Sequence, residues 1–137
     1  MKVLGIAIIV LAILVAAVPY FNNCEHDGKH LTLANGREVP MKCYWTAQAE
    51  AGLALPILAL GAVMAGSRRR ETTRALGALG AVLGLVVMLL PTYLIGVCTT
   101  MTGSCNLVMR PAMLFVGTLI VAVSLAALVV AQRSPSR

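Results

Sequence analysis

The chain has 137 residues, of which 59% are hydrophobic and only 12% are charged, and its net charge is +6 at pH 7. An average soluble domain is about 25% charged, so this composition excludes an ordinary soluble globule, which needs more polar groups to cover its surface. The length allows one domain, residues 1–137.

Four apolar runs each approach the roughly 20 residues that cross a bilayer as a helix. They predict helices over about 3–21, 46–66, 75–97 and 111–131. The segments between them are two outer loops, 22–45 and 98–110, and a cytoplasmic loop, 67–74. The first run could instead be a cleaved signal peptide, because Lys2 precedes it and 15–17 resembles a cleavage site. We expect a retained helix, because the run is long for a signal core.

The charges divide unequally between the two sides of the predicted membrane. The termini and loop 67–74 carry the whole net charge of +6, whereas the charges of the two outer loops and adjoining helix ends cancel. The positive-inside rule therefore predicts a multi-pass protein of the cell membrane with both termini in the cytoplasm. Three arginines in a short turn make no footprint for nucleic acid, so we expect no such partner.

The first outer loop contains a hairpin signal, Asn-Gly at 35–36, between short alternating runs. A two-residue turn there would place Leu33 opposite Glu38 and Thr32 opposite Val39. A lone hairpin is marginal in water, so a disulfide across its base would compensate. The predicted fold is therefore an all-α integral membrane protein, a four-transmembrane-helix up-down bundle with a small disulfide-pinned outer β-hairpin cap.

All four cysteines fall in the predicted outer loops, Cys24 and Cys43 in the first and Cys98 and Cys105 in the second. In a bacterial-type cell that side is oxidising, which favours disulfides. Four cysteines allow three pairings, and the sequence does not select one. We favour Cys24–Cys43 and Cys98–Cys105, because each closes a local loop, whereas cross-pairing would link the two loops.

The start of the second helix holds the candidate interface residues. Trp45 belongs to a predicted belt of aromatic side chains at the membrane surface, and Thr46 is a plausible N-cap. Glu50 would then lie in the first helical turn as an interfacial carboxylate. The alternative is a carboxyl group buried in the bundle, where its charge would be either paired, with Arg110 or Lys42, or removed by a proton.

Small residues predict where the helices approach each other. Gly77, Gly80 and Gly84 recur on one side of the third helix, and small residues allow close contact between backbones in lipid. Pro56 and Pro91 each remove a helical hydrogen bond and are expected to kink their helices.

The motif MKCYWTAQAE at 41–50, PTYLIGVC at 91–98 and the nearby Cys105 resemble a family of small bacterial and archaeal four-pass membrane proteins. The family is catalogued as a domain of unknown function, and the resemblance covers nearly the whole chain. It implies four helices and paired outer cysteines. Many members have histidine where this chain has Tyr44. The genes of some members occur together with genes for exporter-type permeases, which implies that this protein is an accessory subunit.

The sequence favours a non-enzymatic accessory or assembly subunit. Its expected partners are the lipid bilayer and either a second copy, as a homo-oligomer, or another membrane protein such as a transporter permease. An alternative is thiol–disulfide exchange, because the layout is similar to that of quinone-coupled disulfide-forming membrane proteins. Those proteins carry Cys-x-x-Cys, however, and the separations here are 19 and 7 residues.

Soft-metal binding is a further alternative, because thiolate and thioether ligands suit Cu(I). The candidate ligands are Cys24, His26, His30, Met41, Cys43, Cys98, Met101 and Cys105. Oxidised thiols cannot bind, and Tyr44 stands at the histidine position of the related proteins. We therefore expect neither a metal nor another cofactor.

Overall fold

The computed structural model describes residues 2–25, 28–67, 69–98 and 102–133. Its long helices are α1 (Lys2–Phe21), α2 (Lys42–Gly66), α3 (Arg70–Leu89) and α4 (Arg110–Arg133). Two π-helical turns adjoin them, η1 (Leu90–Leu94) and η2 (Cys105–Met109). A two-stranded antiparallel hairpin is formed by β1 (Leu31–Thr32) and β2 (Glu38–Val39).

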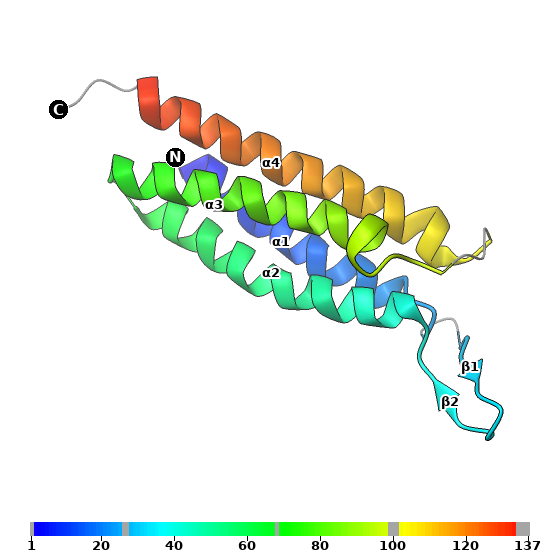
Figure 1. Ribbon diagram of the computed structural model, residues 1–137. Coiled ribbons are helices and arrows are strands. Elements are labelled where there is room, and N and C mark those ends of the chain that lie inside the picture. Colours follow the sequence, from blue (N-terminus) through cyan, green and yellow to red (C-terminus); the bar gives the residue numbers. More distant parts are fainter. Residues whose placement is uncertain (1, 26–27, 68, 99–101, 134–137) are drawn as a thin grey trace.

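The four helices are long and apolar enough to cross a membrane, as the sequence predicts. They run side by side, with both termini at one end and the hairpin at the other (Figure 1). We call these the termini end and the hairpin end. Helix α1 packs mainly against α2, and α3 mainly against α4, so the bundle consists of two helix pairs.

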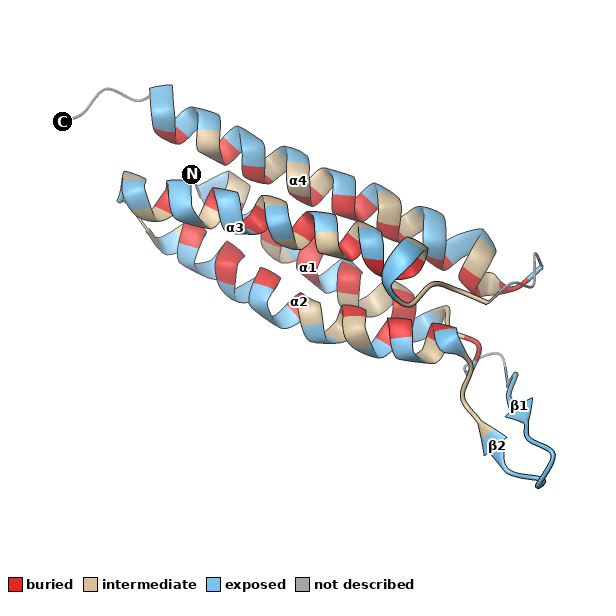
Figure 2. Ribbon diagram, viewed as in Figure 1, coloured by how far each residue is buried: buried red, intermediate tan, exposed pale blue. Residues whose placement is uncertain are grey.

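The buried residues lie on the sides of the helices that face one another, and the outward sides are exposed (Figure 2). Many of these exposed side chains are large and apolar, among them Ile13, Leu55, Val82 and Phe115. An apolar exterior of this kind fits contact with lipid. Helix α1 places Ile8, Ala12 and Val15 fully in the core, so it is an integral part of the bundle. The rest of the core includes Ile57, Met64, Val87, Met109, Met113 and Ile120.

Glycines bring the helices of each pair together. A Cβ atom added to Gly5 would lie 2.6 Å from the backbone nitrogen of Ala65, where α1 meets α2. In the other pair, a Cβ atom on Gly80 would lie 2.5 Å from Oγ of Ser124. Gly77 and Gly84 meet α4 in the same way, which confirms the close approach expected from the glycine spacing.

The hairpin is present, but its predicted register is wrong by one residue. Leu31 pairs with Val39 and Thr32 with Glu38. The turn has a three-residue loop, 34–36, closed by a hydrogen bond from Leu33 N to Arg37 O at 2.9 Å. Within residues 34–36 of this turn only Gly36 has positive φ, +78°, whereas a two-residue type I′ turn requires positive φ at the preceding residue too.

The helix ends at the hairpin end also differ from expectation. Helix α2 begins at Lys42 with Met41 as N-cap, one turn before the predicted Thr46. Helix α3 gives way to the π-helical turn η1 at Leu90, next to Pro91. Gly96, with φ of +80°, then turns the chain away from the helix axis.

Candidate functional site

Four cysteine sulfurs meet at the hairpin end. Cys24 and Cys43 form a disulfide. The Sγ atom of Cys98 lies 2.9 Å from Sγ of Cys43 and 3.4 Å from Sγ of Cys24. The Sγ atom of Cys105 lies 3.2 Å from Sγ of Cys24. We call these four residues the sulfur cluster.

The sulfur cluster draws on both helix pairs. Cys24 follows the end of α1 and Cys43 lies in the first turn of α2, whereas Cys98 follows η1 and Cys105 opens η2. Three of the sulfurs belong to side chains that are at most 4% exposed. Cys98 is half-buried and is therefore the most accessible member.

The pairing expected from the sequence is confirmed in its first half. Cys24 and Cys43 are joined, but Cys98 and Cys105 are not joined to each other. The prediction for the second loop is wrong because both loops fold across the same helix ends. Cys98 consequently contacts the disulfide of the first loop instead of closing its own.

The fold also brings together some of the candidate soft-metal ligands. The ligand atoms of Cys24, Cys43 and Cys105 all lie within 4.8 Å of one another, and Sδ of Met41 lies 3.7 Å from Sγ of Cys98. The set could hold a soft metal only after reduction of the disulfide, because metal ligation requires thiolates. His30 is exposed and does not belong to this group. His26 and Met101 lie outside the described residues.

Below the sulfur cluster, Thr46 links the two helix pairs. Its side chain is fully buried, and Oγ1 donates a hydrogen bond of 2.7 Å to the carbonyl oxygen of Gly96. The turn that Gly96 makes after η1 is what brings this carbonyl to α2. Thr46 therefore joins the second helix to the segment after the third, and it is not the N-cap that the sequence suggested.

Glu50 is fully buried on the same inward face of α2, one turn further along. Neither carboxylate oxygen has a hydrogen-bond partner among the described residues. The expectation of an interfacial carboxylate is wrong, because α2 starts a turn earlier and so carries Glu50 into the bundle. Arg110, the partner considered for a buried Glu50, is exposed.

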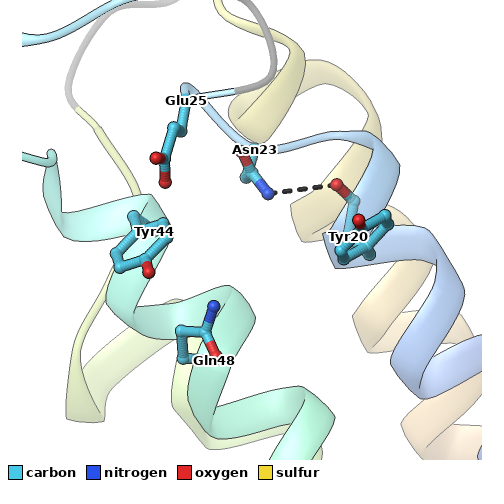
Figure 3. Close-up of a pocket in the computed structure, with 5 residues that line it drawn as sticks. All are labelled: Tyr20, Asn23, Glu25, Tyr44 and Gln48. Atoms are coloured by element: carbon cyan, nitrogen blue, oxygen red, sulfur yellow. Dashed lines mark hydrogen bonds between the residues drawn. The ribbon is translucent and has the colours of Figure 1, made fainter.

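A shallow polar pocket of about 350 Å³ lies beside the sulfur cluster, between the end of α1 and the start of α2 (Figure 3). Asn23 donates a hydrogen bond of 3.0 Å to the carbonyl oxygen of Tyr20 at its edge. The sequence did not predict this pocket, because it depends on how the ends of α1 and α2 lie relative to each other. The lining residues are Tyr20, Asn23, Glu25, Tyr44 and Gln48.

Two of the candidate interface residues face outward. Trp45 is 58% exposed, and its ring makes an edge contact with Tyr44, with 5.5 Å between the ring centroids. Arg110 is also exposed, at the start of α4. These two side chains are accessible to lipid or to a partner, whereas Thr46 and Glu50 are not.

Comparison with curated proteins gives no match, and no solved structure matches either. A family model described as "Domain of unknown function (DUF4418)" matches residues 2–130. This match covers most of the chain, so the chain belongs to that family.

Proposed function

We propose that this protein is a small, multi-pass protein of the cell membrane that serves as an accessory or assembly subunit. Its partner is a second copy or another membrane protein, such as a transporter permease. The observation that carries the proposal is the joining of the two helix pairs at the hairpin end. There the sulfur cluster and the hydrogen bond from Thr46 to Gly96 hold the two loops on the helix ends.

Backbone that is already held by such contacts suits assembly, because association then requires less loss of conformational freedom. Near this surface Trp45 is exposed, and Trp and Arg are the residue types that most often dominate interfaces. Arg110 is exposed at the same end of the bundle. The hairpin adds two short, mostly exposed strands that project from the helices (Figure 1).

The orientation in this proposal follows from charge. The arginines near the loop between α2 and α3 lie at the termini end, and the positive-inside rule assigns that end to the cytoplasm. A cysteine introduced by Ser67→Cys should react with an impermeant maleimide only after the membrane is opened. The unsubstituted protein controls for native thiols, and labelling of the new cysteine in intact cells would contradict the orientation.

Assembly is tested by native mass spectrometry of the protein extracted from its own membrane in lipid nanodiscs. We expect a homo-oligomer or a stoichiometric membrane partner. The substitution Trp45→Ala should weaken that association by about tenfold, the scale of an interface anchor. Leu125→Ala is the control, because Leu125 is 48% exposed on α4 and lies about four helical turns from Arg110, away from the hairpin end. A monomer without partners in the unsubstituted protein would refute the proposal.

A further inference from the structure

We propose that the sulfur cluster is a thiol–disulfide exchange centre, in which Cys98 passes the oxidising equivalents of the buried Cys24–Cys43 disulfide to an external dithiol. The substrate class is a dithiol on the hairpin side of the membrane. This activity goes beyond the proposed assembly role and does not require it, because all the sulfurs belong to one chain.

The sulfur of Cys98 contacts both sulfurs of the disulfide. Thiol–disulfide exchange begins when a thiolate attacks one sulfur of a disulfide. The Sγ atoms of Cys98 and Cys43 are 2.9 Å apart, so they are in contact, and rotation about the Cα–Cβ bond of Cys98 has to bring its sulfur into line with the Cys24–Cys43 bond before attack. Cys98 is 3.4 Å from the other disulfide sulfur, Sγ of Cys24, so Cys43 is the nearer target.

The first step rearranges bonds without net oxidation. Cys98 loses its thiol proton to water, which its half-buried position allows, and its sulfur bonds to Cys43. The bond between Cys24 and Cys43 breaks, and the electron pair leaves with Cys24, which then takes up a proton. The product contains a disulfide between Cys43 and Cys98 and a thiol at Cys24.

The second step uses the accessibility of Cys98. The original disulfide is sealed, because Cys24 is 4% exposed and Cys43 is 0% exposed. In the rearranged form one disulfide sulfur belongs to the half-buried Cys98. A thiolate of the external dithiol attacks this sulfur and releases the thiol of Cys43. The second thiol of the substrate then displaces Cys98, so the substrate becomes a disulfide and the cluster gains two electrons and two protons.

A structural role alone does not account for this arrangement. A stable loop-closing disulfide needs only its own two cysteines, and contact with a third thiol gives it a route to rearrange. The rearrangement also changes which parts of the protein are linked. The bond between Cys24 and Cys43 joins α1 to α2, whereas a bond between Cys43 and Cys98 joins the two helix pairs.

The test separates all four cysteines onto different peptides. Trypsin cleaves between Cys24 and Cys43, for example after Lys29, and cyanogen bromide cleaves after Met101, between Cys98 and Cys105. The protein is placed in lipid nanodiscs, treated with substoichiometric dithiothreitol, quenched in acid and alkylated. The linked peptides are then identified by mass spectrometry.

We expect a peptide linking Cys43 to Cys98 to accumulate before the disulfide is lost. The substitution Cys98→Ala should abolish this peptide and slow reduction of the Cys24–Cys43 disulfide by about tenfold or more, because the accessible relay is removed. In Cys105→Ala, which retains Cys98, the peptide should still form. Circular dichroism of each variant checks that the helices are intact.

The unsubstituted protein decides the question even if the variants fail to fold. A linkage of Cys24 to Cys43 alone at every time point, with Cys98 fully alkylated, would overturn the proposal. A stable linkage of Cys98 to Cys105 would overturn it as well, and so would reduction of Cys98→Ala at the unsubstituted rate. A metal bound by thiols with no disulfide, found by elemental analysis, would also refute it. None of these results depends on whether the protein assembles, so this inference and the proposed function fail separately.

Discussion

At the hairpin end, the contacts between the two helix pairs differ in kind from the contacts within each pair. Within a pair, small residues bring two backbones together, as where Gly5 meets Ala65 and where Gly80 meets Ser124. Between the pairs, the hairpin end is joined by sulfur contacts and by the hydrogen bond from Thr46 to Gly96. Close packing of small residues therefore stabilises each pair, whereas sulfur contacts and a hydrogen bond join the two pairs at this end.

This difference has a physical cause. Lipid gives helices no hydrophobic reason to associate, so close packing of small residues is the general solution within a pair. Near the membrane surface the loops carry polar backbone groups and cysteines. Hydrogen bonds and sulfur contacts can therefore join the helix pairs there. The two kinds of contact should therefore respond to different perturbations.

The largest effect should come from removing the disulfide. In the double variant Cys24→Ala/Cys43→Ala, we expect the free energy of unfolding to fall by about 3 kcal/mol, because the unfolded chain regains the freedom of a closed loop of this length. Unfolding in mixed detergent micelles measures the change. Faster proteolysis between residues 29 and 42 should accompany it.

Single variants sharpen the same comparison. Cys24→Ala leaves Cys43 beside Cys98, at 2.9 Å, so a replacement disulfide between the pairs can form. The loss of stability should therefore be smaller than in the double variant. Equal losses in the single and double variants would show that Cys98 does not substitute for Cys24.

A smaller effect is expected for Gly5→Ala. The new Cβ atom would lie 2.6 Å from the backbone nitrogen of Ala65, so α1 and α2 must move apart. Overpacking of this kind costs about 1–3 kcal/mol. Unfolding in detergent measures the cost, and disulfide mapping should show the Cys24–Cys43 bond intact.

The matched control is Gly52→Ala in α2. Nothing lies within 4 Å of a Cβ atom there, and alanine is the better helix former, so stability should be unchanged or slightly higher. If both substitutions had the same effect, close packing would not explain the contact of α1 with α2.

Glu50→Gln should act in the opposite direction. Glu50 is fully buried and its carboxylate oxygens have no hydrogen-bond partner among the described residues. An unpaired carboxyl group in apolar surroundings is costly, so a neutral amide of similar shape should raise the free energy of unfolding by about 1 kcal/mol or more. Thermal unfolding in nanodiscs tests this expectation. Glu71→Gln, at an exposed position, is the control and should change stability by less than about 0.5 kcal/mol.

A decrease in stability with Glu50→Gln would show that the carboxylate has a stabilising partner in the membrane. An increase in stability with a loss of assembly would instead mark Glu50 as a residue kept for function at a cost to the fold. Either result would show whether the buried part of α2 around Glu50 contributes to stability or to assembly independently of the contacts at the hairpin end.

The sequence predicted the helices well because their apolar runs are long and are separated by polar loops. It predicted the glycine contacts because their spacing places them on one side of a helix. It missed the burial of Glu50 for a local reason, since the start of α2 was placed at Thr46 and one helical turn moves a carboxyl group from the surface into the bundle.

The sequence could not predict that the four cysteine sulfurs contact one another, and the reason is different. Proximity in the chain favoured a bond between Cys98 and Cys105, but the path of each loop depends on backbone geometry such as the positive φ of Gly96. The hairpin register was missed in the same way, because the turn type depends on the φ of the residue before Gly36. Local spacing predicts elements, and tertiary geometry decides which loops touch.

The smallest predicted effect is that of Thr46→Val, which removes the hydrogen bond to the carbonyl oxygen of Gly96 at 2.7 Å. Valine has nearly the same shape, so packing is preserved and the carbonyl group is left without this donor. The loss should be about 1 kcal/mol, as for a typical buried hydrogen bond. Thr118→Val is the control, because its exposed hydroxyl group donates at 2.7 Å to Leu114 in its own helix and lies 3.8 Å from Sδ of Met88 within the α3–α4 pair, so it does not link the two pairs. If Thr46 joins the two helix pairs, its loss should also increase alkylation of Cys98, because the segment between Gly96 and Cys98 would move more freely against α2. If neither the alkylation of Cys98 nor the stability changed, the hydrogen bond of Thr46 would not join the helix pairs. The sulfur cluster would then be the contact that joins them at the hairpin end.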